Sequence, residues 1–200
     1  MTPTALILDF GEVLTNSQPR SIVERMAAIA RLPVEQFVTR YWAHRPEYDA
    51  GMAATEYWRR VLDGLAGLPP WVVRDLIEED ARSWRDYRTG MWDIAAGFRA
   101  RGHRTAILSN GVPEVMSRVR AERTLESWFD VVIVSCEVGM CKPAPAIYRT
   151  CIERLDVPAD TALFVDDRIE NLRGAESVGL QTFHFTGDSS IGDLRGILGL

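Results

Sequence analysis

The sequence predicts an α/β protein: a parallel sheet with helices on both faces, and a block of helices inserted after the first strand. The 200 residues, 46% of them hydrophobic, suit one α/β domain plus a modest insertion. Short apolar strands alternate with helical segments after residue 90, which is typical of a covered parallel sheet. Upstream of them, residues 16–88 show only helical periodicity. We therefore expect a core of residues 1–15 and 89–200 and an inserted four-helix cap of residues 16–88.

The first strand is the short apolar run Leu6–Leu8, which ends in Asp9 and turns at Gly11. Four apolar stripes at helical spacing follow it, separated by glycine and proline residues. The stripes are Ile22–Ile29, Val34–Trp42, Tyr57–Leu65 and Val73–Trp84, and the separators are Gly51, Gly64, Gly67 and Pro69-Pro70. Because the insertion follows Asp9 directly, we expect it to lie over the carboxyl ends of the strands. We expect most of its aromatic rings to form its own core.

The segments after residue 88 alternate between helix and strand. Helical spacing covers Met91–Arg101, Val112–Val119, a segment starting near Pro145 and the segment Ile169–Leu172, and the strands are Thr105–Leu108, Val131–Val134, Ala162–Val165 and Gln181–Phe185. The β-branched run Val131–Val134 is typical of a strand buried on both faces. Proline is well placed in the first turn of a helix, so Pro145 suits a helix start.

Carboxylates follow two of these strands. Asp9 ends the first strand, and Asp166-Asp167 end the strand Ala162–Val165. Ligands of open parallel sheets bind in the crevice beyond the carboxyl ends of the strands. Three carboxylates gathered there would raise one another's pKa unless a cation neutralised them. Mg²⁺ is a hard ion that prefers oxygen ligands, so the sequence predicts a magnesium site at this edge.

Composition excludes several classes of protein. A net charge of −5 and a pI near 5.3 argue against binding to nucleic acid or to an anionic membrane. No apolar run approaches the roughly 20 residues of a membrane helix, and the amino-terminal segment lacks the pattern of a signal peptide. The three cysteines, Cys136, Cys141 and Cys151, show no zinc-site spacing. We therefore expect reduced thiols and a cytoplasmic location.

Four segments stand in chain order, each at a strand end or a helix entrance. They are Asp9-Phe10-Gly11-Glu12-Val13, Ser109-Asn110, Lys142-Pro143 after Ser135-Cys136-Glu137-Val138-Gly139, and Asp166-Asp167-Arg168-Ile169-Glu170-Asn171. Together they resemble the haloacid dehalogenase (HAD) superfamily of phosphatases and relatives. The resemblance spans the whole chain and includes a small helical C1-type cap and a D-x-G first motif. It implies a Rossmann-like core with strand order 5-4-1-2-3.

The resemblance also implies roles for individual residues. Asp9 would be the nucleophile that forms an aspartyl-phosphate, with Ser109 and Lys142 as the other catalytic residues. The phosphate would be bound by Ser109, Lys142 and the amides of Asn110 and Gly111, which we expect to open a helix. Mg²⁺ would be held by Asp9, the carbonyl of Gly11, Asp166 and Asp167. The implied function is a Mg²⁺-dependent phosphatase of a small phosphorylated metabolite, acting as a monomer or homodimer.

Two positions depart from the family pattern: Gly11, and Asn171, which stands where many relatives have aspartate. Family phosphatases usually carry an acid/base aspartate two residues after the nucleophile, where this chain has Gly11. Loss of such a group typically costs about 10²–10⁴-fold in rate. Two alternatives therefore stay open: a low-activity or non-catalytic member that binds a phosphorylated ligand, and a 2-haloacid dehalogenase. The dehalogenase reaction needs no metal, so Asp166-Asp167 argue against it. The cap residues that could set specificity are Arg20, Tyr41, Trp42, His44, Arg45 and Tyr48.

Overall fold

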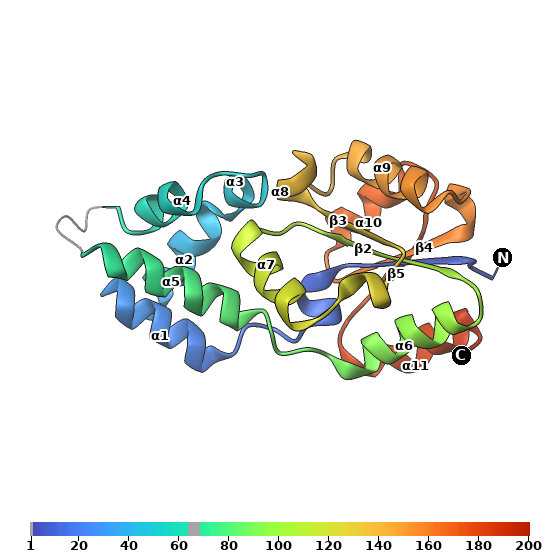
Figure 1. The fold of residues 1–200 in the computed structure, drawn as a ribbon, viewed down its shortest axis with the longest axis horizontal. Helices are drawn as coiled ribbons and strands as arrows, with labels where there is room; N and C mark the ends of the chain where they lie inside the picture. The colour runs from blue at the N-terminus through green and yellow to red at the C-terminus, as the bar shows by residue number, and fades with distance from the viewer. Residues whose placement is uncertain (1, 64–68) are drawn as a thin grey trace.

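A five-stranded parallel sheet forms the centre of the protein (Figure 1). The computed structural model describes residues 2–63 and 69–200. The strands are β1 (Ala5–Leu8), β2 (Arg104–Ser109), β3 (Val131–Val134), β4 (Ala162–Asp166) and β5 (Gln181–His184). They lie in the order β3-β2-β1-β4-β5, which confirms the predicted order read from the other edge. Since β1 pairs with both β2 and β4, Asp9 leaves the sheet at its middle.

Alternate residues of β1 face two separate apolar cores, as the pleat of a strand requires. Leu6 and Leu8 pack with the core that includes α6 and α11, whereas Ala5 and Ile7 pack with the core of α9 and α10. Figure 1 shows these two pairs of helices on opposite faces of the sheet. The helices of this part are α6 (Thr89–Ala100), α7 (Pro113–Glu122), α8 (Ser135–Val138), α9 (Pro145–Leu155), α10 (Ile169–Glu176) and α11 (Ile191–Leu198).

The insertion lies at the end of the sheet where β1 ends, as predicted from its place after Asp9 (Figure 1). Its described helices are α1 (Arg20–Ala30), α2 (Val34–Ala43), α3 (Arg45–Asp49), α4 (Ala54–Val61) and α5 (Pro70–Ser83). Four of them correspond to the four predicted stripes, and the short α3 is an addition. Pro46 lies in the first turn of α3, where proline is tolerated. Leu65, Gly64 and Gly67 of the prediction lie outside the described residues.

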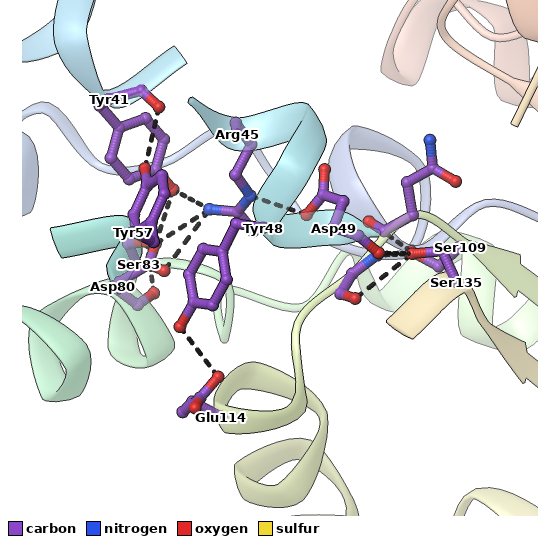
Figure 2. Close-up of polar contacts among 12 residues, drawn as sticks. Tyr41, Arg45, Tyr48, Asp49, Tyr57, Asp80, Ser83, Ser109, Glu114 and Ser135 are labelled. Carbon is purple, nitrogen blue, oxygen red and sulfur yellow. Dashed lines mark hydrogen bonds and ion pairs between the residues drawn. The ribbon is translucent and has the colours of Figure 1, made fainter. Parts of the chain in front are cut away.

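Helix α3 is fastened to the core by two side chains (Figure 2). The Ser135 hydroxyl, at the start of α8, donates to the carbonyl of Asp49 at 2.5 Å. The Tyr48 hydroxyl donates to the Glu114 carboxylate of α7 at 2.9 Å. These contacts hold α3 above the carboxyl ends of β2 and β3. Within residues 2–63 and 69–200, none of the helices combines the length and apolarity that crossing a bilayer demands.

Gly174 of α10 lets this helix pack directly on the loop that carries Lys142. A Cβ at Gly174 would lie 2.5 Å from the Pro143 carbonyl oxygen and 3.0 Å from the Tyr148 ring. We expect Gly174→Ala to lower the free energy of unfolding by about 1–3 kcal/mol, because the backbone of the loop must move. Gly192→Ala in α11 is the matched control, since its Cβ would meet nothing within 4 Å. Urea unfolding of both variants is the measurement, and equal midpoints would contradict the close packing.

Candidate active site

Asp9 follows β1 directly and is almost fully buried, with 7% of its surface exposed. Its Oδ1 accepts a hydrogen bond from the Phe10 amide at 2.7 Å. The same oxygen lies 2.8 Å from Lys142 Nζ. The chain then turns sharply through Phe10–Leu14, where Glu12 adopts a positive φ of 61°. The turn fixes the carboxylate at the strand end and aims it at Lys142.

Lys142 is the only lysine of the sequence, and its ammonium lies between two carboxylates. Nζ is 2.8 Å from Asp9 Oδ1 and donates to Asp166 Oδ2 at 2.6 Å. Burial lowers the pKa of Lys142, but Asp9 and Asp166 outweigh burial and raise it, so the group stays charged. Asn110 holds the backbone here: its side chain donates to the Lys142 carbonyl and accepts from the Lys142 amide, at 2.9 and 2.8 Å.

Asp166 and Asp167 differ in what surrounds them. The two oxygens of Asp166 accept from Lys142, from the Arg168 amide at 2.9 Å and from Asn171 Nδ2 at 3.0 and 3.1 Å. Asp167 is only partly buried, and its backbone carbonyl is held by His184 Nε2 at 3.0 Å. The Asp166 oxygens are therefore already occupied by hydrogen bonds, one of which orients Lys142. The Asp167 carboxylate is more available to a cation than that of Asp166.

The three acids fit a divalent cation. One oxygen from each of Asp9, Asp166 and Asp167 lies within 4.8 Å of the others. Burial raises the pKa of Asp9 to about 7, against the lowering effect of Lys142, and the two neighbouring acids add to the rise. Burial and Asp166 raise the pKa of Asp167 to about 6. Carboxyl groups that resist ionising together are stabilised by a bound cation, and oxygen donors suit Mg²⁺.

Mg²⁺ is expected to stabilise the protein more strongly as the pH rises. The folded-state pKa values of Asp9 and Asp167, about 7 and about 6, lie above the ordinary 3.8. Without metal, these groups stabilise the fold fully below about pH 4 and lose that contribution as the pH rises to about 7. Mg²⁺ requires the ionised carboxylates, so its apparent affinity should rise on the order of tenfold to a hundredfold between about pH 5.5 and pH 8. The measurement is the increase in melting temperature that Mg²⁺ causes at each of the two pH values. An increase of the same size at both pH values would contradict the prediction. So would an increase in Asp167→Asn as large as that in wild type.

The phosphate-binding residues are only partly arranged as predicted. Ser109 ends β2 and is buried, and its hydroxyl lies 3.3 Å from the Asn110 carbonyl. The Gly111 amide, which we expected to face an anion, donates instead to Ser135 Oγ at 3.0 Å. Helix α7 begins at Pro113, so Asn110 and Gly111 precede the helix and do not open it. Lys142 therefore remains the better-placed donor, because it lines the cavity whereas the Ser109 hydroxyl donates to the Asn110 carbonyl.

A cavity of about 130 Å³ opens above Asp9 and continues into one of about 630 Å³. The residues that line both are Trp42, Arg45, Asp49, Asn110, Lys142, Asp167, Arg168 and Asn171. Trp84 covers Gly11: a Cβ at Gly11 would lie 3.3 Å from its ring. The Trp42 side chain, which lines both cavities, is 46% exposed. Other aromatic rings of the insertion, such as Phe37 and Trp58, are buried as expected.

The sequence interpretation missed Asp49 and Trp84 as residues of the site. Asp49 accepts from Arg45 Nε at 2.9 Å, and the i, i+4 spacing of this pair was a usable signal for it. No local pattern distinguished Trp84 from the buried rings of the insertion. The carboxylate of Glu12, the residue after Gly11, accepts a hydrogen bond from the Ser17 hydroxyl at 2.9 Å.

The chain is similar in sequence to known proteins, among them a hydrolase family and a phosphatase. A family model described as haloacid dehalogenase-like hydrolase matches residues 3–179. "Acyl-CoA dehydrogenase family member 10" from Mus musculus is 36% identical over 111 residues, which are 54% of this chain and 10% of that protein. The chain therefore matches only a small part of that relative. "D-ribitol-5-phosphate phosphatase" from Bacteroides thetaiotaomicron is 25% identical over 193 residues, covering 89% of each chain.

A solved structure shows the same fold. The magnesium complex of the HAD family enzyme bt-2542 from Bacteroides thetaiotaomicron superposes with a TM-score of 0.81. The superposition covers 97% of this chain and 98% of that one, at 19% sequence identity. At this identity the likeness concerns the fold alone.

Proposed function

Because this chain belongs to the haloacid dehalogenase-like hydrolase family, we propose that it is a Mg²⁺-dependent phosphatase of a small phosphorylated metabolite. The observation that carries the proposal is the buried Asp9 carboxylate, held 2.8 Å from Lys142 within a cluster of three acids. A phosphatase relative of similar length supports the substrate class.

The proposed reaction uses the chain's own groups in two steps. Lys142 and Ser109 bind the phosphate oxygens, and an Asp9 oxygen attacks phosphorus while the bond to the leaving oxygen breaks. Water then cleaves the aspartyl-phosphate and regenerates Asp9. Asp9, the Gly11 carbonyl, Asp166 and Asp167 would hold Mg²⁺, whose charge offsets the repulsion between Asp9 and the phosphate.

The insertion, residues 16–88, would serve as a cap that closes this site, and residues 1–15 and 89–200 as the catalytic core. Arg45, Asp49 and Trp84 reach the cavity from the insertion, which supports this division. We place the enzyme in the cytoplasm as a monomer or homodimer. The dehalogenase alternative is less well supported, since the cluster of acids suits a metal that such a reaction does not need.

The experiment that tests the function is a panel of phosphomonoesters assayed for phosphate release with Mg²⁺ and with EDTA. We expect release that depends on Mg²⁺. Release that survives EDTA would contradict the role of the metal. Chloride release from 2-chloropropionate, without phosphatase activity, would favour the dehalogenase alternative.

Gly11 should make the enzyme depend on the quality of the leaving group. Without an acid to protonate the departing oxygen, aryl phosphates should exceed alkyl phosphates in kcat/KM by about 10²–10⁴-fold. Gly11→Asp should lower the ratio of aryl to alkyl kcat/KM, because the new carboxyl group can protonate the departing oxygen. The Trp84 ring, 3.3 Å from the new Cβ, must then move by a few tenths of an ångström. Gly11→Asn is the matched control, because it has the same shape and supplies no acid. Equal ratios in Gly11→Asp and Gly11→Asn would show that another group already delivers the proton.

A further inference from the structure

We infer that the part of the cavity that receives the leaving group accepts an uncharged group and disfavours a second anion. The substrate would then be a phosphomonoester whose negative charge lies only on its phosphate. This inference rests on the proposed phosphatase function and narrows its substrate class. It follows from how each cation around the cavity is already engaged.

Arg45 is the cation that the described part of the cap presents to the cavity, and it is neutralised from two sides (Figure 2). Its Nε donates to Asp49 Oδ1 at 2.9 Å, and its Nη1 lies 3.4 Å from both oxygens of Asp80. Nη1 also contacts the Tyr41 hydroxyl, which donates to Asp80 at 2.6 Å. One guanidinium faces two carboxyl groups here, so no positive charge remains for a ligand.

Aromatic rings fix the guanidinium in this position. Its central carbon lies 5.3 Å from the ring centre of Tyr41, 5.7 Å from that of Tyr48 and 5.9 Å from that of Trp84. The side chain is only 7% exposed. Turning Arg45 toward a ligand would break a buried ion pair and leave a buried carboxylate without its partner, which is costly.

The remaining cations of the described cavity walls are Lys142 and Arg168. Lys142 is engaged by Asp9 and Asp166 and would bind the phosphate itself. Arg168 pairs with Glu170 at the rim, where the two side chains are 59% and 50% exposed. Exposed pairs of this kind are weak, so Arg168 is the cation that could compete for a second anion. An experiment must therefore separate Arg168 from Arg45.

What the walls do offer is aromatic surface. Trp42 stands edge-on to Trp84, with ring centres 6.5 Å apart and planes at 83°. Both rings line the cavity that contains Asp9. Burying an uncharged group against such rings is favourable, whereas an anion near Asp49 would be repelled.

The test compares two nearly isosteric substrates, 4-carbamoylphenyl phosphate and 4-carboxyphenyl phosphate, which differ by one negative charge. Wild type should favour the carbamoyl compound in kcat/KM by roughly tenfold or more. Asp49→Asn should lower that ratio by roughly tenfold, because it removes the carboxylate that lines the cavity and leaves Arg45 paired with Asp80 alone. The difference in acidity of the two phenols cancels when the ratio is compared between variants.

Two controls accompany Asp49→Asn. Glu24→Gln makes the same charge change on the exposed face of α1, where Glu24 pairs with Arg20, and should leave the ratio as in wild type. Arg168→Gln should also leave the ratio unchanged. A ratio near one in wild type, a ratio that Asp49→Asn does not move, or a preference that Arg168→Gln alters would each overturn the inference.

Binding keeps this test separate from catalysis. Calorimetry of both compounds with Mg²⁺-loaded Asp9→Asn measures the preference without turnover. If the carbamoyl compound binds more tightly but wild type releases no phosphate, the proposed function fails and the charge preference stands. Equal affinities, or no binding of either compound, would overturn the inference.

Discussion

Asp9→Asn is expected to lower kcat by on the order of 10⁴–10⁶, because loss of a nucleophile removes the whole covalent route. The amide has the shape of the carboxylate but cannot attack phosphorus. The variant should fold, since Lys142 keeps its 2.6 Å hydrogen bond to Asp166. Phosphate release from an aryl phosphate at saturating Mg²⁺, with circular dichroism to check the fold, is the measurement.

Glu12→Gln is the matched control for this variant, because Glu12 lies in the same turn and lines the same cavity. It should lose far less activity, since the Glu12 carboxylate is engaged by Ser17. Comparable losses in the two variants would mean that Asp9 is not singled out as the nucleophile.

Lys142→Met is expected to damage both activity and stability. The change leaves the buried Asp9 and Asp166 without their shared cation, and breaking a buried ion pair in this way costs about 3–5 kcal/mol. Activity should fall on the order of 10³-fold or more, because the phosphate loses a charged donor. Arg20→Met is the stability control: its pair with Glu24 is exposed, and such pairs contribute about 0–1 kcal/mol.

The loss of stability in Lys142→Met should depend on pH with a definite sign. Removing Lys142 takes away the group that lowers the pKa of Asp9, so this pKa rises further above about 7. The folded state then holds its proton more tightly than the unfolded state, and stability falls as the pH rises through that range. Urea unfolding in EDTA at about pH 5 and about pH 8 should show the larger deficit at the higher pH. A larger deficit at the lower pH would contradict this account.

Much of the fold could be predicted because its determinants are local. A continuous apolar run such as Val131–Val134 indicates a buried strand, and apolar residues at helical spacing indicate a helix. The carboxyl ends of parallel strands lie at the same edge of a sheet. That rule, with the family resemblance, predicts that Asp9 and Asp166 lie close together. The strand order itself came from the resemblance.

The features that escaped prediction depend on contacts between distant segments. The Gly111 amide is taken by Ser135, which is 24 residues away in sequence. Trp84 covers Gly11 from the far end of the insertion, although its spacing resembles that of a ring in the helical core. Helix α3 spans only five residues, too few to show a helical period. Each of these outcomes is decided by tertiary packing, which leaves no repeat in the sequence.

The most direct test of the central claim is to trap the covalent intermediate. Wild type is mixed with an aryl phosphate and Mg²⁺, quenched in acid within one turnover and digested, and the peptides are sequenced by mass spectrometry. The account predicts one phosphoryl group on Asp9, absent when EDTA replaces Mg²⁺ and absent in Asp9→Asn. A phosphoryl group on another residue, or full turnover without any phosphorylated Asp9, would contradict it.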